Sequence, residues 1–358
     1  MVSARLLSLY LARSVLLGIG LTCVLLVSIY TLIDFIREAR SLSGSYGAVE
    51  MLWYLAQTLP RRLYDIFPFA ALIGTLLGLG GLAAGNELVA MRAAGFDRGH
   101  LSARIVLTVA LCLVLVVALA EWVIPDLETR ARAERQQART GQLHVGKLGQ
   151  LWLRDGASIL RLGQAFWLDE AVLEFSDVLI YRLDDDMRPE QVLHAAQASH
   201  QGGRWLLRDA RWRDLDTDAA GQQLDVLELA SGLNPELFVA AVSRPRLLAA
   251  KDLQAMRTYL SRSGLEAGAY EQAFWARIFF PLNVLTMVLV GLPFVFRGAR
   301  SGTHGAGLFT GVALGLVFFV LTRVTQSLGL VWPLPLWFSS LLPAAAFLLL
   351  GLVLLRRL

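Results

Sequence analysis

The chain has 358 residues, of which 56% are hydrophobic and 17% are charged, and its formal net charge is +4. This composition is too apolar for an ordinary soluble protein and too charged for a chain that lies wholly in a bilayer, so we expect a membrane part and a water-exposed part. The cations are spread along the chain without a basic stripe, which argues against nucleic-acid binding.

The first third of the chain contains three long apolar runs, Val15–Ile33, Phe67–Leu82 and Ile105–Ile124. Their lengths are close to the roughly 20 residues that a helix needs to cross the hydrocarbon core. The first run is too long for the core of a signal peptide, and no small-residue cleavage site follows it. We therefore expect three transmembrane helices, the first of which stays as an anchor.

A short polar segment, AAGNELVAMRAAGFDRGH (Ala83–His100), separates the second and third runs. Asn86 as an N-cap, Glu87 in the first turn and Gly95 as a stop predict a short helix with an apolar face. Such a helix either docks in a groove of a separate ATPase subunit or lies on the membrane as a connector. Periodicity alone favours the connector.

The long polar interval that follows is typical of β-structure. Three short runs with alternating apolar residues, Leu151–Leu162, Phe175–Leu183 and Arg204–Leu215, are separated by turn-forming residues. They predict a small all-β domain, such as a sandwich, a jelly roll or a half-barrel. After it, Lys251–Arg262 with Gly264 at its end predicts a helix that leads back to the membrane.

Three more apolar runs complete the chain, Phe274–Phe296, Gly305–Leu321 and Leu334–Leu355. The expected fold is an α-helical membrane protein with six transmembrane helices and a jelly-roll-like all-β periplasmic domain inserted between helices 3 and 4. The expected domains are residues 1–125 with three helices, 126–269 with the β-domain, and 270–358 with three helices.

The loops that carry most of the arginine predict the orientation, because an excess of Lys and Arg marks the cytoplasmic side. The loop 325–333 has neither, whereas the loop 34–65 carries four arginines and weakens the asymmetry. Both termini are expected in the cytoplasm and the large domain in the periplasm. The arginines assigned to the cytoplasmic side are Arg5, Arg13, Arg92, Arg98, Arg104, Arg297, Arg300, Arg356 and Arg357.

No catalytic centre is visible in the sequence. The histidines are scattered, and both cysteines, Cys23 and Cys112, lie inside apolar runs, so neither a disulfide framework nor a thiolate zinc site is available. GQLHVGKL (Gly141–Leu148) lacks the Ser or Thr that completes a phosphate-binding loop. The chain is therefore not expected to be an enzyme, which leaves transport or anchoring.

Four segments carry a resemblance to a known family: Phe67–Gly95, Ala120–Pro125, Trp275–Leu289 and Leu342–Leu349. The chain resembles the lipopolysaccharide export permeases, the LptF/LptG family, along essentially its whole length, although the β-domain matches mainly in its layout.

The resemblance implies that two permeases pair in the inner membrane of a Gram-negative cell. An LptB ATPase dimer lies beneath them, an LptC subunit intercalates its single helix near the first span, and lipopolysaccharide passes through jelly-roll domains to an LptA-type periplasmic bridge. ATP and Mg are bound by the ATPase subunit, and the chain itself is expected to hold no metal or other cofactor. In this scheme the segment at about 85–96 is the coupling helix, with Glu87 foremost, and the residues assigned to it are Glu87, Leu88, Met91, Arg92, Gly95 and Phe96.

The substrate suggests roles for residues near the ends of the spans. Arg37 and Arg40 are candidate ligands of the lipid A phosphates, with a solvated rim as the alternative, and Asp34 stands where the family usually has a basic residue. Ordinary lipid or helix contact is the alternative for each candidate contact to the acyl chains. Those candidates are Leu25, Ile29, Phe318 and Phe319.

Three further charges lie at or within the spans. Glu121 and Arg277 form a possible pair, and Arg323 is expected to extend its charge to the interface. One alternative function is that of an ABC permease for another lipid or a lipoprotein, but a lipoprotein-release or efflux permease normally has four spans with the outer domain between the first two. The other alternative is a membrane-anchored scaffold without transport activity, which fits the same hydropathy but does not need a helix that binds an ATPase.

Overall fold

The computed structural model describes residues 2–42, 46–93, 95–140, 151–163, 165–169, 172–184, 186, 188–201, 204–215, 223–230, 245–301, 304–332 and 334–356. The segment Gly141–Leu148 lies outside them. The chain forms two compact units: unit 1 comprises Met1–Arg37, Thr58–Ile124 and Gly268–Leu358, and unit 2 comprises Glu38–Gln57 and Pro125–Ala267.

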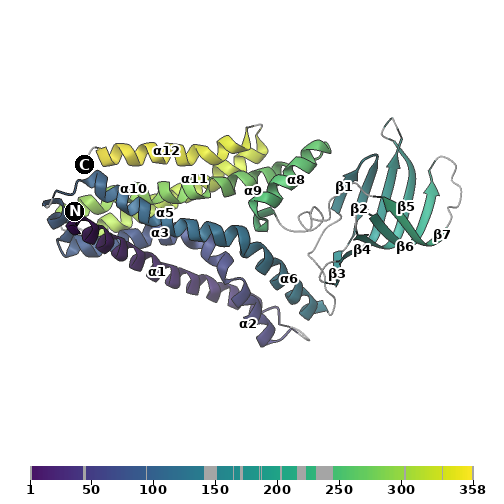
Figure 1. Cartoon of the computed structure of the whole chain (residues 1–358), viewed down its shortest axis with the longest axis horizontal. Coiled ribbons are helices and arrows are strands. Elements are labelled where there is room, and N and C mark those ends of the chain that lie inside the picture. Colours follow the sequence, from purple (N-terminus) through teal and green to yellow (C-terminus); the bar gives the residue numbers. More distant parts are fainter. Residues whose placement is uncertain are drawn as a thin grey trace. The chain divides into compact units, whose positions relative to one another are not determined.

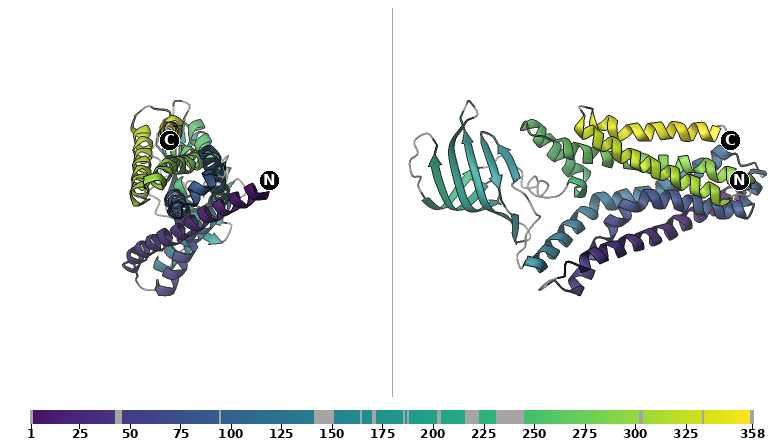
Figure 2. Two further views of the ribbon diagram at one scale, coloured as in Figure 1. Left: turned by 90° about the vertical axis from the view of Figure 1, so that its left-hand side faces the viewer. Right: turned by 180° about the vertical axis from the view of Figure 1, so that it is seen from behind.

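Unit 1 is a bundle of long apolar helices (Figure 1). Five are single candidate membrane spans, and α9 with α10, bent by 49° at their junction, passes the same test as a pair. With that pair as one span, the described residues contain the six spans that the sequence predicts. In both the front and back views, α1 begins and α12 ends at the same end of the bundle (Figures 1 and 2). The helices are α1 (Val2–Ala39), α3 (Leu59–Ala84), α4 (Glu87–Ala93), α5 (Arg98–Trp122), α9 (Gly268–Ile278), α10 (Phe280–Ser301), α11 (His304–Val331) and α12 (Leu336–Arg356).

The bend between α9 and α10 has a local cause. Pro281 lies in the first turn of α10, where its missing N–H costs no hydrogen bond. The backbone N–H of Phe279 still donates to the carbonyl of Trp275 over 2.9 Å, and the N–H of Asn283 donates to Phe279 over 2.9 Å. The chain therefore changes direction at Phe279 with its backbone still bonded on both sides.

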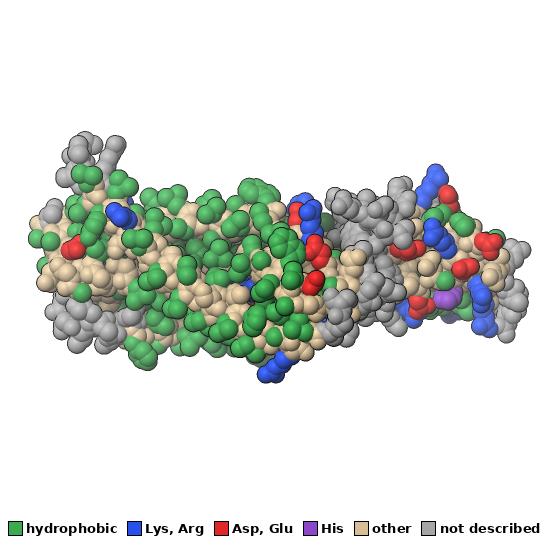
Figure 3. Space-filling model, turned by 90° about the horizontal axis from the view of Figure 1, so that it is seen from below, with side chains coloured by type: hydrophobic (Ala, Val, Ile, Leu, Met, Phe, Trp, Pro, Cys, Tyr) green, Lys and Arg blue, Asp and Glu red, His purple; other side chains and the backbone are tan. Residues whose placement is uncertain are grey.

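The core of unit 1 is built around α3. Its side chains Leu72, Leu76 and Leu79 are at most 1% exposed, whereas Leu21 and Val24 on α1 are 70% and 67% exposed. On the face drawn in Figure 3, apolar side chains are spread along the helices with few charged ones among them. Such a surface suits hydrocarbon and not water, which fits a bundle whose outer helices meet lipid or other membrane helices.

The helices α1 and α3 approach each other so closely that only glycine fits between them. A Cβ atom added to Gly74 would lie 2.5 Å from the backbone nitrogen of Ile19, and one added to Gly78 would lie 2.6 Å from the carbonyl oxygen of Ser14. The Ser14 hydroxyl also donates to the Gly78 carbonyl over 3.0 Å. The spacing Gly74 to Gly78 therefore marks a helix contact face.

Unit 2 contains one antiparallel sheet and several helices. The strand order is β1-β2-β4-β5-β6-β7, with β3 paired to β4. The predicted run 151–162 is the hairpin β1–β2, and α8 confirms the helix expected before Gly264. The sequence does not predict α2. The elements are α2 (Ala48–Gln57), α6 (Ile124–Thr140), β1 (Leu151–Asp155), β2 (Ser158–Leu162), β3 (Ala165–Asp169), β4 (Val172–Leu183), β5 (Pro189–Gln201), β6 (Arg204–Asp214), β7 (Gln223–Ala230), η1 (Pro245–Leu247) and α8 (Ala250–Arg262).

Buried and exposed side chains alternate along the strands of the sheet, but this alternation shifts by one residue at neighbouring positions of adjacent strands. In β4 both Phe175 and Val178 are buried, with two residues between them in place of one. Asp177, within this gap, adopts φ 51°, and Asp209 on β6 does the same. These left-handed residues turn the strands so that the buried positions on both sides of the shift face the same core.

Helix α8 covers one edge of the sheet. The Tyr259 hydroxyl accepts the backbone N–H of Arg154 over 2.9 Å and donates to the carbonyl of the same residue over 2.7 Å. Both outward-pointing backbone groups of Arg154 are thus paired, which protects that part of the β1 edge from pairing with another strand. Burial is the main cause that raises the pKa of Tyr259, so the hydroxyl stays protonated as a donor.

Candidate functional site

The first candidate site is the short helix α4, which joins the spans α3 and α5. A residue with a left-handed backbone lies on each side of it: Asn86, directly before the helix, has φ 59°, and Gly95, two residues after its end, has φ 91°. Gly95 therefore ends the helix as the sequence predicts, whereas Asn86 closes the turn from α3 and does not have the extended backbone of an ordinary N-cap. Two tight turns fix the direction of α4 relative to both spans.

The apolar face of α4 points into the bundle. Leu88 and Met91 are 2% and 4% exposed within the core of unit 1, and Phe96 packs against the same core. Val89 is 46% exposed, and Ala90 and Ala93 are exposed beside it. A partner at this end therefore meets a small surface of Val89, Ala90 and Ala93, whereas Leu88 and Met91 connect the helix to the spans.

This arrangement differs from the expectation that Leu88 and Met91 contact an ATPase directly. Burial in the bundle core competes for the same apolar face, and the core takes it. Glu87 is half-buried and interacts with the Tyr10 hydroxyl of α1. The side chain of Arg92 lies outside the described part of the structure. Val89 belongs to the apolar run from which the helix is predicted, but it is not among the residues assigned to the coupling role.

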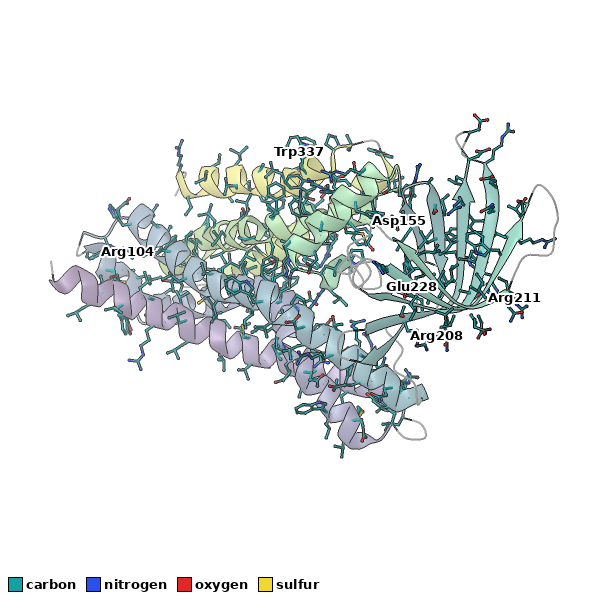
Figure 4. All side chains as sticks on the ribbon, turned by 45° about the vertical axis from the view of Figure 1, so that its right-hand side comes forward. Arg104, Asp155, Arg208, Arg211, Glu228 and Trp337 are labelled. Atoms are coloured by element: carbon teal, nitrogen blue, oxygen red, sulfur yellow. The ribbon has the colours of Figure 1, made fainter. Side chains whose placement is uncertain are left out.

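The second candidate site lies at the far end of the spans, which we define by Ala39 on α1, Leu59 on α3, Trp122 on α5 and Gly268 on α9. Figure 4 shows Arg104 near the α4 end of the bundle and Trp337 near the far end. Exposed tryptophans gather at this far end, with Trp122 at 77% and Trp337 at 44%. Tryptophan there is typical of a membrane–water interface.

Asp34 at the far end is paired with arginine. Its carboxylate accepts the Nε–H of Arg62 over 2.9 Å, and Arg62, only 4% exposed, also donates to the Thr58 hydroxyl. Arg37 lies 3.7 Å from the same carboxylate with its side chain 75% exposed. Arg40 is exposed just after α1. Two arginines therefore point outward while Asp34 balances the buried charge of Arg62.

Glu121 and Arg277 form an ion pair between α5 and α9. Arg277 also donates to the backbone carbonyl of Ala120, and its guanidinium lies 5.8 Å from the centre of the Tyr64 ring. Tyr64 in turn stacks on Phe280 with ring centres 4.2 Å apart. This cluster joins three spans and leaves neither charge alone in the membrane.

A third polar cluster, which sequence reasoning missed, lies in unit 2. Glu38 accepts from Arg135 on α6 at both carboxylate oxygens and from the Tyr46 hydroxyl over 2.9 Å. Arg135 also lies over the Tyr54 ring. Burial, then the hydrogen bond to Glu38, raises the pKa of Tyr46. Glu38 and Arg135 are 97 residues apart, so no local pattern in the sequence predicts this pairing.

The candidate acyl-chain contacts divide into two classes. Leu25 and Ile29 on α1 are 58% and 48% exposed, whereas Phe318 is 3% exposed and packs against Phe347. Phe319 contacts Phe69 and lies under the guanidinium of Arg323, 5.2 Å from the ring centre. Only the two α1 residues present a broad free surface to a lipid chain, because helix packing takes up Phe318.

Among the described residues, no three His, Cys, Asp or Glu side chains gather in a group that could hold a metal ion. The two candidate sites offer contact surfaces and ion pairs. The site at α4 offers a small exposed surface coupled to the core, and the far end offers outward-pointing arginines beside apolar spans.

The chain matches the family model described as lipopolysaccharide export system permease LptF/LptG over residues 9–357. It is 33% identical over 353 residues to lipopolysaccharide export system permease protein LptG of Escherichia coli (strain K12), covering 97% of each chain. It is 30% identical over 352 residues to the protein of the same name from Haemophilus influenzae, again with 97% of each chain covered.

Proposed function

Since the chain belongs to the LptF/LptG family of lipopolysaccharide export system permeases, we propose that it extracts lipopolysaccharide from the inner membrane as one of two paired permeases. The second permease is of the LptF type, an LptB ATPase dimer supplies the free energy, an LptC subunit contributes one helix, and an LptA-type bridge receives the lipid. ATP and Mg belong to the ATPase in this proposal, and this chain converts the closure of that subunit into movement.

The exposed surface of α4 carries the proposal most directly. Val89, Ala90 and Ala93 form a small, uncharged surface, and Leu88 and Met91 lock the same helix into the bundle. A force applied to the exposed side is thus passed to the packed core. Glu87 links this helix to α1 through Tyr10, so that movement of α4 also acts on the first span.

We place the α4 end in the cytoplasm, with both termini there, and the β-domain in the periplasm of this multi-pass inner-membrane protein. The support is the distribution of arginine: Arg104 is exposed at the α4 end, whereas the loop 325–333 has no Lys or Arg. A Val226→Cys variant on β7, 56% exposed, tests the placement. A membrane-impermeant thiol reagent should label it from the periplasmic side, and labelling only after the inner membrane is broken contradicts the placement.

The substrate is held by two kinds of contact in this proposal. Exposed apolar residues of α1, including Leu25 and Ile29, contact acyl chains, and each buried CH₂ contributes about 0.8 kcal/mol. Arg37 and Arg40 point outward at the end of this helix and bind the phosphates of lipid A. Closure of the paired permeases then removes the acyl contacts and drives the lipid outward.

The decisive experiment measures ATP-driven release of lipopolysaccharide from proteoliposomes that hold the complete complex. Val89→Asp should lower both release and retention of the ATPase subunit, because a charge is placed in an apolar contact, and Glu87→Ala should lower release through loss of the link to α1. Val226→Asp is the matched control, since it adds the same charge at a valine of similar exposure on the sheet.

Normal release by Val89→Asp contradicts the coupling role of the α4 surface. A loss of release in Val226→Asp of the same size shows that the effect comes from added charge in general. If the wild-type complex shows no ATP-dependent release of lipopolysaccharide, the transport proposal itself is wrong.

A further inference from the structure

Helix α2, between the spans α1 and α3, is apolar on two opposite faces. Met51 and Leu55 are 3% and 4% exposed and form a small core with Tyr46. On the other side, Val49 is 75% exposed and Leu52 is 56% exposed. A ten-residue helix with apolar side chains on both faces is unfavourable in water, because only one face is covered by its own unit.

The polar groups of α2 are turned away from its exposed face. Trp53 is 60% exposed, yet its indole N–H donates to Glu134 of α6 over 3.2 Å. Gln57 donates to the same carboxylate over 2.9 Å, and Glu50 accepts the backbone N–H of Gly47 at the start of the helix. The Trp53 ring is thus left as an apolar surface whose single donor is already satisfied.

The exposed face follows helical spacing and has no charge. Positions 49, 52, 53 and 56 recur at intervals of three and four residues, and they hold Val, Leu, Trp and Ala. All four are exposed. We call this set, Val49, Leu52, Trp53 and Ala56, the α2 apolar face.

The position of α2 in the chain restricts what can cover this face. It begins after residues 40–47, and Thr58 alone separates it from α3. Both neighbours, α1 and α3, are candidate membrane spans. A helix attached so closely to two spans stays at the surface of the bilayer from which they emerge.

Exposed apolar residues also continue along the chain on both sides of α2. Ile36 in the last turn of α1 is 49% exposed, Leu42 after it is 42% exposed, and Leu59 at the start of α3 is 39% exposed. Exposed apolar residues therefore stand on both sides of the α2 apolar face in the sequence, with the exposed Arg37 and Arg40 among them on the α1 side. Aromatic and aliphatic side chains on a short helix that borders a span are typical of an interfacial helix.

We infer that α2 lies in the interfacial layer of the membrane, with Val49, Leu52 and Trp53 immersed in the phospholipid of the leaflet where α1 and α3 end. With the orientation proposed above, this is the outer leaflet of the inner membrane. The inference requires that the chain spans the bilayer, and it does not depend on which substrate is carried.

Spin labels at single cysteines test the inference in the complete permease–ATPase complex, reconstituted in vesicles of phosphatidylethanolamine and phosphatidylglycerol without lipopolysaccharide. In a Cys23→Ala/Cys112→Ala background, labels are placed by Val49→Cys, Leu52→Cys and Ala56→Cys. The measured quantity is the collision rate of each nitroxide with oxygen, which concentrates in lipid, relative to a water-soluble nickel chelate.

Two matched positions calibrate the measurement. Leu111 in the middle of α5 is 67% exposed and reports lipid, and Val226 on β7 is 56% exposed and reports water. The expected oxygen-to-nickel ratio for the α2 labels is several-fold above that of Val226→Cys and approaches that of Leu111→Cys. Three α2 positions are used so that a single variant that fails to fold does not decide the result.

Each other outcome overturns the inference. A ratio like that of Val226→Cys means that the face lies in water. Labels shielded from both reagents mean that a protein subunit covers it. A lipid-like ratio that arises only when lipopolysaccharide is added means that the substrate, and not the phospholipid surface, occupies the face. ATP-driven release by wild type and each variant, measured in parallel with lipopolysaccharide-loaded vesicles, shows separately whether the transport proposal holds.

Discussion

The contact between α1 and α3 is built in two different ways along its length. Within the span, Gly74 and Gly78 let the two backbones touch, and no charge is involved. Near the far end, Asp34 and Arg62 join the same two helices by an ion pair. Hydrocarbon gives helices no hydrophobic reason to associate, so the interior contact depends on shape, whereas near the interface a charge pair is tolerated and fixes the ends.

The largest expected effect comes from filling the glycine contact. In Gly74→Ala, the new Cβ atom meets the backbone of Ile19, which cannot rotate away as a side chain would. We expect the chain to lose about 3 kcal/mol of stability, at the upper end of ordinary overpacking. The measurement is equilibrium unfolding of the purified protein in mixed detergent micelles, followed by circular dichroism.

Gly81→Ala is the matched control, because a Cβ atom added there meets nothing within 4 Å. Alanine is the better helix former, so this variant should be more stable by up to about 1 kcal/mol. Equal destabilisation of the two variants would show that the crossing is looser than its glycines indicate.

The second largest effect is expected from a substitution that breaks the ion pair between α5 and α9. Arg277→Gln leaves Glu121 without its cation and should cost about 2 kcal/mol. This is less than the loss of a fully buried pair, because the side chain of Glu121 keeps 24% exposure. The double variant Glu121→Gln/Arg277→Gln should recover part of the loss in the same unfolding measurement. A double variant that is no better than Arg277→Gln means that Arg277 acts through Tyr64 and the Ala120 carbonyl and not through charge.

The third prediction tests whether the contact between Asp34 and Arg62, at the far end of α1 and α3, depends on their opposite charges. Asp34→Lys places a third cation beside the buried Arg62 and the exposed Arg37, and we expect a loss of about 1.5 kcal/mol, limited because a lysine can extend toward water. Exchange of both charges, Asp34→Lys/Arg62→Asp, should restore at least half of this stability. If the exchange restores nothing, the geometry of the guanidinium and its bond to Thr58 matter more than the charge.

The parts of the fold that the sequence predicts are those governed by length and local pattern. Apolar runs predict the spans because the bilayer imposes a minimum length. Gly95 predicts the end of α4 because glycine tolerates the left-handed backbone that often ends a helix, and it has φ 91° there. Helix α2 was missed for the opposite reason. Its ten residues are too few for a span, and its apolar residues lie on both faces, so they do not indicate which face its own unit covers.

The sequence predicts the helix α4 but not the direction of its apolar face. The apolar face of α4 was assigned to a partner, whereas Leu88 and Met91 face the core and Val89 faces outward. A single amphipathic helix looks the same in sequence whether its apolar face meets its own chain or another. Ion pairs across long separations, such as Glu38 with Arg135, likewise need the fold before they can be seen.

The smallest expected effect on stability separates the contribution of close backbone packing from that of hydrogen bonding where α1 crosses α3. Ser14→Ala removes the hydroxyl that donates to the Gly78 carbonyl but leaves the close backbone approach unchanged. Hydrogen bonds between membrane helices contribute about 0.6 kcal/mol on average, so the loss should be of that size. Thr22→Ala is the control, because its hydroxyl donates to the Gly18 carbonyl within α1 and not between helices.

If Ser14→Ala destabilises the chain as much as Gly74→Ala does, the hydrogen bond and not the glycine packing holds α1 to α3. A small loss in Ser14→Ala beside a large one in Gly74→Ala means that the interior of the crossing depends on shape alone, and that side-chain bonding between the two helices is concentrated at their far end.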